Sequence, residues 1–284
     1  MSDPLAVIAS LPGVREAVDE ARQAVDRLYR HRVLRRASPA VSAESSLRGA
    51  RASAAIEGVD VPLDALRRDE IHDPLVQGAL RASAEMGRLG ATWRRAPRQV
   101  LARLHTVAAA GLVPEAALGR PRPVDAGLMD SGLMDSGLVG SEPGESGLVG
   151  AASDPFGLGP APDAKETAAR MDGLMGLLER PTKAPAIVLA AVVHAELVVL
   201  RPFGTADGVV ARSAERLTLV EYGLDPKSLV AVEVGHRELP YAEGLRAYLS
   251  GTPEGVAQWV QHCASAVSLG VRETTAVCEA LQRG

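Results

Sequence analysis

The sequence predicts an all-α fold, and three observations support this prediction. Apolar residues recur at helical spacing through most of the chain, no segment shows the period-two alternation typical of strands, and the breaks between helical segments are short. Hydrophobic residues make up 46% of the 284 residues, enough for a sizeable core in one large domain or two small ones. Because aromatic residues contribute only 3%, Ala, Leu and Val must build that core.

The predicted helices follow one another from the N-terminus. The first covers residues 14–36 and ends in a basic cluster, which suits the negative end of a helix dipole. The second covers residues 44–58 and ends at Gly58, a residue type that often caps helix C-termini. A short helix follows Pro62, and another begins at Lys227. The remaining helices are expected over residues 74–93, 97–111, 163–178, 184–200, 209–222, 238–250 and 254–281.

One segment departs from the helical pattern. Between about residues 119 and 162 the chain repeats a Gly-Leu unit separated by Asp, Ser and Gly, which offers too little bulk to form a core. We therefore expect a disordered insertion here, whose short apolar stretches could also bind weakly to a partner. The insertion interrupts a main domain over residues 44–284, and residues 1–43 form an N-terminal helical extension.

Composition argues against several classes of function. The formal net charge is −4 with acidic and basic residues interleaved, so no surface typical of nucleic-acid binding is expected. No stretch of about 18 apolar residues occurs, and the N-terminus lacks a basic region followed by an apolar run, so we expect neither a membrane span nor a signal peptide. Cys263 and Cys278 are expected to be reduced and buried, which favours a cytoplasmic location.

A loop between two apolar helices carries the strongest functional signal. Residues 201–208 read RPFGTADG, in which Pro202 disfavours helix and Gly204 and Gly208 permit backbone angles closed to other residues. A tight loop that leads into a helix N-terminus directs several backbone N–H groups the same way, and such an arrangement binds anions. Arg212 lies in the first turn of the next helix, where a cation gains nothing from the helix dipole, so its position is best explained by an anion.

These residues resemble the motif of the Fic family, also called Fido. That motif reads H-P-F-x-[D/E]-G-N-G-R-x-x-R, and Pro202, Phe203, Gly208 and Arg212 match it. The resemblance covers roughly residues 44–281 and implies a Fic-type helical bundle with a helix–loop–helix motif. Fic proteins typically transfer AMP from ATP to a hydroxyl side chain of a target protein, so ATP with Mg is the implied cofactor. The implied phosphate- or nucleotide-binding residues are Arg201, Phe203, Gly204, Asp207, Gly208 and Arg212.

A second motif precedes the loop. Many Fic proteins carry an inhibitory helix with the pattern [S/T]-x-x-x-E-[G/N], and residues 53–58 fit this pattern in full. In that family the Glu pairs with the last Arg of the loop motif, which is Arg212 in this chain. The resemblance therefore implies that Ser53 and Glu57 belong to an inhibitory helix. The alternative is that Glu57 is an exposed carboxylate at a helix end.

Five positions of the loop depart from the family motif. Arg201 stands where the family has the His that acts as general base, and a guanidinium stays protonated at ordinary pH. Thr205 replaces the acid that holds magnesium, Ala206 replaces a Gly, and Val209 replaces an Arg that binds phosphate. Asp207 replaces an Asn. As a helix N-cap it would occupy the amides that a phosphate needs, although it could alternatively hold magnesium itself.

Two histidines outside the motif are expected to have structural roles. His105 lies on an apolar helix face and is expected to be a core residue with its hydrogen bonds satisfied. His194 lies about two helical turns before Arg201, too far along the helix to replace the missing base. We therefore identify no catalytic residue and no metal ligand. Active relatives hold a β-hairpin flap in the region of the insertion, but no alternating pattern predicts one here.

The sequence thus predicts a Fic-like protein that has lost ordinary AMP transfer and acts as a nucleotide- or protein-binding module. The alternative is a divergent protein adenylyltransferase that uses Asp207 for metal and another group as base. A purely structural role is a third hypothesis. The implied partner is a target protein that the sequence does not name, and neither nucleic acid nor a membrane is expected as a partner. No feature of the sequence indicates an oligomeric state.

Overall fold

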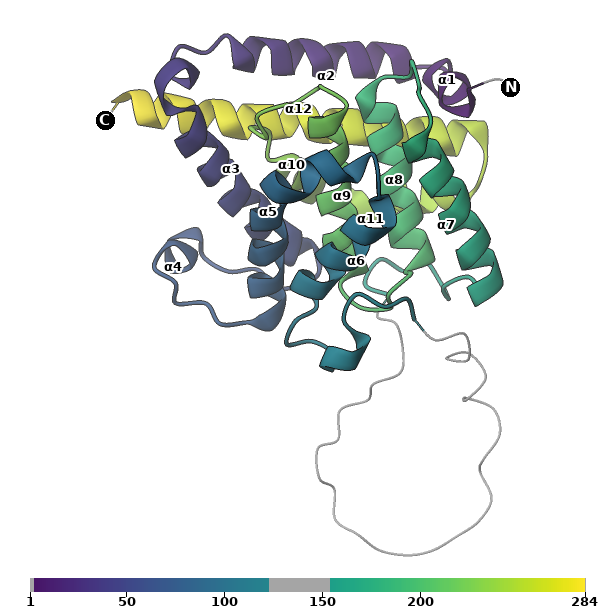
Figure 1. The fold of residues 1–284 in the computed structure, drawn as a ribbon. Coiled ribbons are helices and arrows are strands. Elements are labelled where there is room, and N and C mark those ends of the chain that lie inside the picture. Colours follow the sequence, from purple (N-terminus) through teal and green to yellow (C-terminus); the bar gives the residue numbers. More distant parts are fainter. Residues whose placement is uncertain (1–2, 123–153, 284) are drawn as a thin grey trace, which may run out of the picture.

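The computed structural model describes residues 3–122 and 154–283, which form helices joined by short connections (Figure 1). No strand occurs among these residues, so the all-α prediction is confirmed. The helices are α1 (Pro4–Ala9), α2 (Val14–Tyr29), α3 (Leu34–Ile56), α4 (Leu63–Arg67), α5 (Pro74–Trp93), α6 (Pro97–Ala108), the 3-10 helix η1 (Glu115–Ala117), α7 (Ala164–Glu179), α8 (Ala186–Leu200), α9 (Asp207–Glu221), α10 (Val232–Glu238), α11 (Tyr241–Leu249) and α12 (Pro253–Arg283).

The N-terminal helices differ most from the prediction. The expected helix over residues 14–36 ends at Tyr29, and α3 then runs from Leu34 to Ile56 with non-helical backbone angles at Ala37. The expected boundary between residues 43 and 44 therefore falls inside a helix, because apolar spacing alone does not show where the chain turns. The division into an extension and a main domain stays a prediction, and α2 packs along α12 in the common core (Figure 1).

The helix predicted from Lys227 is also wrong, since α10 begins only at Val232. The carboxylate of Asp225 explains the difference. It accepts hydrogen bonds from the amides of Leu229 and Val230 at 3.0 and 2.8 Å. An Asp side chain that accepts hydrogen bonds from nearby backbone amides competes with the hydrogen bonding of a helix and favours a turn.

The core is organised around α8, which is buried on nearly all sides. Its sequence AIVLAAVVHAELVVL is apolar at almost every position, as is typical of a helix at the centre of a domain. The helices α9, α12 and α7 pack against it (Figure 1). Two buried tryptophans fill the surrounding space and satisfy their indole N–H groups. Trp93 donates to the hydroxyl of Thr218 at 3.1 Å, and Trp259 donates to the carbonyl of Ala191 at 2.8 Å.

The ends of the predicted insertion have defined positions. Residues 119–122 and 154–162, at the edges of the expected insertion of about 119–162, belong to the described part of the chain. The amide of Arg122 donates to the carbonyl of Pro202 at 2.8 Å, and the guanidinium of Arg246 donates to the carbonyl of Phe156 at 3.0 Å. The first contact attaches the N-terminal end of the expected insertion to the loop after α8. The second attaches its C-terminal end to α11. The rest of the expected insertion and the region of the flap, residues 123–153, lie outside the described residues.

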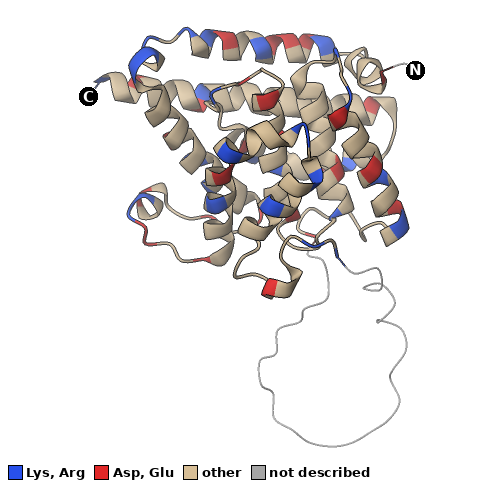
Figure 2. Ribbon diagram, in the orientation of Figure 1, with Lys and Arg blue, Asp and Glu red and all other residues tan. Residues whose placement is uncertain are grey.

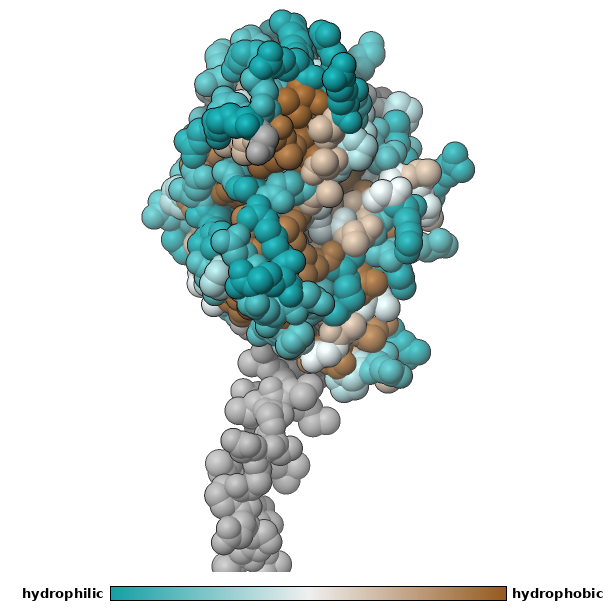
Figure 3. Space-filling view, turned by 90° about the vertical axis from the view of Figure 1, so that its left-hand side faces the viewer, coloured by the Kyte–Doolittle hydropathy of each residue, from teal (hydrophilic) through white to brown (hydrophobic). Residues whose placement is uncertain are grey.

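Charged residues are spread over the described part of the molecule, with acidic and basic side chains interleaved along the helices (Figure 2). None of the described helices combines the length and the hydrophobicity that crossing a membrane requires. Cys263 and Cys278 are free and buried, as predicted. Figure 3 shows the side on which α3 and α4 lie, where hydrophobic residues line hollows between hydrophilic ridges. A hollow of about 680 Å³ lies between α3, α5 and α9.

Candidate functional site

The loop between α8 and α9 turns sharply through residues with positive φ. Arg201 follows α8 with φ 44° and ψ 57°, Gly204 has φ 80°, and Ala206 precedes α9 with φ 55°. Such angles cost a non-glycine residue roughly 1–3 kcal/mol, so Arg201 and Ala206 place strain in the loop. Backbone hydrogen bonds hold the turn. The amide of Gly204 donates to the carbonyl of Arg201 at 3.2 Å, and the carbonyl of Pro202 accepts from Arg122.

Asp207 is the first residue of α9 rather than its N-cap, so the N-cap prediction is wrong. Its Oδ1 accepts the amide of Phe203 at 3.0 Å, and the amide of Gly204 also bonds to this carboxyl group. The carboxyl group therefore occupies amides of the loop instead of those of its own helix. Burial raises the pKa of Asp207 to about 7 despite these amides, and Glu57 acts in the same direction. The alternative role of Asp207 as a magnesium ligand stays a prediction.

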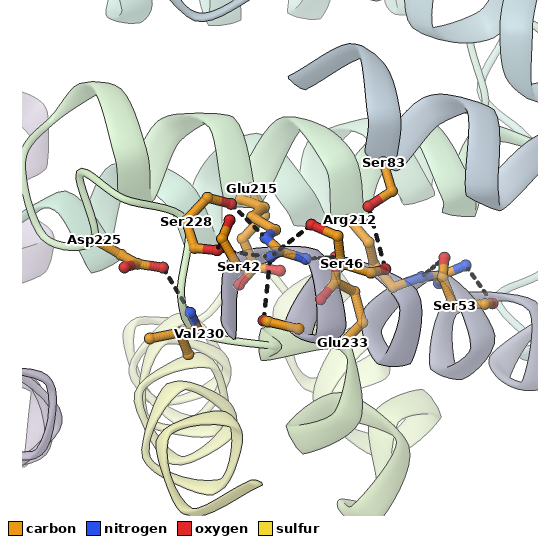
Figure 4. A network of polar contacts seen from close by, with 12 residues as sticks. Ser42, Ser46, Ser53, Ser83, Arg212, Glu215, Asp225, Ser228, Val230 and Glu233 are labelled. Carbon is orange, nitrogen blue, oxygen red and sulfur yellow. Dashed lines mark hydrogen bonds and ion pairs between the residues drawn. The ribbon is translucent and has the colours of Figure 1, made fainter. Parts of the chain in front are cut away.

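Arg212 is wholly buried and bound to the end of α3. Its guanidinium donates to Glu57 Oε1 at 2.6 Å, to the hydroxyl of Ser53 at 2.9 Å and to the Ser53 carbonyl at 3.1 Å. Figure 4 shows Ser53 facing this guanidinium from α3. A Cβ atom added to Gly208 would lie 2.0 Å from Glu57 Oε1, so only glycine lets the carboxylate approach the loop. The pairing of Glu57 with Arg212 is present, whereas its inhibitory role stays a prediction.

A buried polar network continues from Arg212 through Tyr241, whose hydroxyl lies 3.3 Å from the guanidinium and 2.7 Å from His194 Nε2. His194 Nδ1 and His236 Nε2 each lie 2.7 Å from Glu215 Oε2. All of these contacts are satisfied when both imidazoles are neutral and each donates its N–H to Glu215. His194 Nε2 then accepts the hydroxyl of Tyr241. Burial lowers the pKa of His194 to about 4, and the two histidines lower the pKa of Glu215 although burial alone would raise it. His194 is therefore structural.

The same network contains a set of residues that could hold a metal ion. The donor atoms of His194, Glu215 and His236 lie within 4.8 Å of one another, and all three residues are buried. Two imidazoles and one carboxylate are a ligand set that zinc and non-haem iron use. In this structure, His194 Nδ1 and His236 Nε2 each form a hydrogen bond with the same oxygen, Oε2 of Glu215. Through His194, Glu215 thereby positions the hydroxyl of Tyr241 beside Arg212.

A cavity of about 270 Å³ lies over the loop. Its charged lining residues are one cation, Arg201, and three carboxyl groups, those of Glu57, Asp154 and Asp207. The segment 154–158 forms another part of the wall. The guanidinium of Arg201 donates to the carbonyl of Gly159, directly after this segment. Because Glu57 is paired with Arg212 and Asp207 is partly protonated near pH 7, the cavity as it stands offers no excess of positive charge to an anion.

Phe203 does not line the loop cavity. Its ring stacks on the imidazole of His105, with the ring centroids 4.2 Å apart and the planes 5° from parallel. His105 Nδ1 accepts the amide of Gly119 at 2.9 Å, but its Nε2 is buried without a hydrogen-bond partner among the described residues. His105 is therefore a core residue as expected, although its hydrogen bonding is not fully satisfied. Burial lowers the pKa of His105 to about 4, so the stacked imidazole is neutral at pH 7.

The structure thus divides the predicted site residues into two groups. Five of them line the loop cavity together: Glu57, Arg201, Gly204, Asp207 and Gly208. Phe203 and Arg212 lie outside the cavity lining, and Ser53 binds the buried guanidinium. Sequence reasoning missed Asp154, Phe156 and Tyr241. The first two follow the Gly-Leu repeats that were assigned to disorder, and nothing local marks Tyr241 as a partner of an arginine. The binding roles assigned to these residues stay predictions.

Comparison with solved structures shows what this arrangement is similar to. A Fic family protein from Desulfovibrio desulfuricans G20 matches with a TM-score of 0.65 over 92% of this chain and 74% of that chain, at 21% sequence identity. A fragment of Fic-1 from C. elegans matches with a TM-score of 0.64 over 94% of this chain and 73% of that chain, at 16% identity. No family model matches the sequence, and no curated protein does. The likeness shows that the chain has the Fic fold.

Proposed function

We propose that this Fic-fold chain does not carry out ordinary AMP transfer and acts as a binding module for a protein partner. The state of the loop cavity carries this proposal. Arg201 stands at the position of the family's general base, and its guanidinium is bonded to the carbonyl of Gly159. Glu57, Asp154 and Asp207 line the space in which an AMP-transfer site needs cationic groups. This cavity therefore lacks both the general base and the excess of cationic groups that AMP transfer requires.

The size of the cavity supports the same proposal. Small-molecule pockets usually measure roughly 300–1,000 Å³, whereas about 270 Å³ is open over the loop. A nucleotide with its phosphates would require residues 154–158 to withdraw. Two contacts hold this segment in place. Arg246 donates to the carbonyl of Phe156 at 3.0 Å, and the Phe156 ring meets the Tyr241 ring edge to face, with centroids 5.0 Å apart.

Nucleotide binding is the second candidate function, and the pair of Glu57 and Arg212 favours it. Arg212 is a buried cation, while the side chain of Glu57 is 14% exposed at the C-terminal cap of α3. A phosphate oxygen is a stronger charged acceptor than most groups that could replace this carboxylate. Under this candidate function the cavity takes a nucleotide only when Glu57 leaves Arg212. Wild-type protein would then bind ATP weakly, and the Glu57→Gly variant would bind it more tightly.

Transfer activity is tested by restoring the family motif. Three proteins are incubated with Mg, a cell lysate and ATP labelled in its α-phosphate: wild type, Glu57→Gly, and Glu57→Gly with five restored loop residues. The restored residues are Arg201→His, Thr205→Asp, Ala206→Gly, Asp207→Asn and Val209→Arg. We expect labelled protein only with the restored chain. Label from the unrestored Glu57→Gly protein would contradict the proposal and support the adenylyltransferase alternative.

Binding of nucleotide is tested separately by thermal unfolding with millimolar ATP. We expect no rise in the melting temperature of the wild-type protein, because the cavity is small and acidic. A rise that disappears in Arg212→Ala would favour the nucleotide candidate over the protein-binding one. The Glu57→Gly variant serves as the control that opens the ion pair without changing the loop.

A further inference from the structure

Residues 154–159 form a turn beside the loop cavity. The Asp154 carboxylate accepts the amide of Leu158 at 2.9 Å and that of Gly159 at 2.8 Å, so the turn is fixed by its own hydrogen bonds. Phe156 and Leu158 are half-buried and pack against the core, whereas the residues between and beside them are exposed. The segment thus directs its two large apolar side chains toward the body of the protein.

Two arginines from other parts of the chain hold this turn. Arg246 of α11 donates to the carbonyl of Phe156 at 3.0 Å, and Arg201 donates to the carbonyl of Gly159. The Asp154 carboxylate attracts the same Arg201 guanidinium. Both hydrogen bonds are charge-assisted and have main-chain carbonyls as acceptors. The two guanidinium groups therefore hold the backbone of the segment at two points, and neither bond depends on the side chain of the residue that accepts it.

The ring of Phe156 connects the turn to the buried network beneath it. It meets the ring of Tyr241 edge to face, with the centroids 5.0 Å apart. The Tyr241 hydroxyl lies 3.3 Å from Arg212, whose guanidinium binds Glu57. Four residues of the turn also line the loop cavity: Asp154, Pro155, Phe156 and Leu158. The turn therefore restricts the cavity from one side and rests on the residue that contacts its buried arginine.

We propose that residues 154–159 are an autoinhibitory strap, which holds the place of a peptide segment of the protein partner until that segment displaces it. This inference rests on the proposed function and adds its regulation. Arg201 is the latch of the strap, which gives a role to the residue that stands where the family has its general base. Because two arginines bind main-chain carbonyls and Phe156 packs on Tyr241, the displacing segment is a peptide with an aromatic side chain.

Closure of the strap is tested by chymotrypsin cleavage of the full chain after Phe156, followed by mass spectrometry. Cleavage requires the ring to leave the core, so its rate follows the population of open strap. Loss of one charge-assisted hydrogen bond should raise this rate about tenfold or more in Arg201→Met and in Arg246→Met. Arg95→Met, at an exposed residue that does not line the loop cavity, should stay within about twofold of wild type.

Cleavage after Trp93, a fully buried residue of α5, reports general unfolding in the same samples. It should stay as slow as in wild type in both latch variants. Equal cleavage after Phe156 in wild type and the latch variants, or a gain matched after Trp93, would overturn the strap.

Displacement by a partner segment is tested by calorimetry with a synthetic peptide of residues 154–160, blocked at both ends. The receptor is the full chain with Phe156→Ser, whose strap keeps its backbone but loses its aromatic ring. We expect one-site binding at least about tenfold tighter than to wild type, whose own strap competes at high effective concentration. A peptide with Ser in place of Phe, or a receptor that also carries Arg246→Met, should bind about tenfold or more weakly.

Absence of peptide binding to the Phe156→Ser chain, or equal binding to wild type, would overturn the displacement. Failure of the proposed function has a different signature. It would appear as transfer of label from ATP by the Glu57→Gly protein, an outcome that neither the cleavage rates nor the peptide titration measures.

Discussion

Two arginines one turn apart on α9 make similar contacts in different surroundings. Both arginines are almost completely buried. Arg212 contacts Ser53 of α3 and Glu57, whereas Arg216 contacts Ser45 of α3 and Glu233. Arg212 binds Glu57 at 2.6 Å, and that carboxylate is 14% exposed beside the loop cavity. Arg216 lies 3.5 Å from Glu233, which is 5% exposed. The carboxylate of the first pair borders a cavity, whereas that of the second is enclosed by protein.

The bonding around the two guanidinium groups supports this difference. Arg216 donates to the hydroxyl of Ser228 at 3.0 Å, to its carbonyl at 3.1 Å and to the hydroxyl of Ser45 at 3.2 Å. A Cβ atom on Gly49 would lie 2.5 Å from Glu233 Oε2, so the backbone of α3 is pressed against this pair. The comparison teaches that burial of an arginine does not mark a binding site. The two arginines differ in whether the partner carboxylate borders a cavity.

The largest expected effect is the loss of the enclosed arginine. Arg216→Met leaves the Glu233 carboxylate buried without a cation, which typically costs about 3–5 kcal/mol in the free energy of unfolding. Urea-induced unfolding followed by circular dichroism measures this cost. A loss below about 1 kcal/mol would show that the interior pair is not essential for stability and would break the comparison.

A smaller effect is expected for the arginine beside the cavity. Arg212→Met should cost about 1.5–3 kcal/mol, since Glu57 keeps one side toward solvent when its partner is removed. The same urea titration compares the two variants directly. Equal destabilisation by Arg212→Met and Arg216→Met would mean that Glu57 is as enclosed as Glu233 and cannot be displaced by a ligand.

A third effect depends on pH and concerns the carboxyl group in the loop. Burial raises the pKa of Asp207 to about 7, so the folded state binds this proton more tightly than the unfolded state, in which the pKa is near 3.8. Its contribution to stability is present below pH 3.8 and is lost as pH rises toward 7. Asp207→Asn should therefore be more stable than wild type at pH 8 and no more stable at pH 4. Thermal unfolding at the two pH values measures both differences. A gain at pH 4 equal to that at pH 8 would show that titration of Asp207 is not the cause.

The sequence predicted the local features of the site well. Residues four apart share a helix face, so Ser53 and Glu57 were expected on the same side of one helix, and both do contact Arg212. The resemblance to the Fic motif identified that arginine as their partner. Pro202 and Gly204 predicted a tight turn, and the structure has one. These predictions depend on residues close together in the chain or on a motif of fixed spacing.

Contacts between distant segments were not predictable in the same way. Asp154 follows a repeat of small residues, so the sequence indicated disorder and gave no reason to place a carboxylate over the loop. Tyr241 is the first residue of an ordinary amphipathic helix, and only packing brings its hydroxyl to Arg212. The direction of Phe203 likewise depends on His105, which lies on another helix. Pattern and spacing carry no information about which such segments meet.

The sequence by itself determined the helical class, the buried character of α8, the sharp turn after it and the loss of the base and metal-binding residues from the motif. These properties follow from apolar periodicity, backbone preferences and side-chain chemistry, which act within a few residues. Only the tertiary structure decided that three carboxyl groups gather over the loop and that Phe203 stacks on His105, outside the lining of the loop cavity. The physical reason is that the charge and shape of a cavity depend on which surfaces of distant helices pack together.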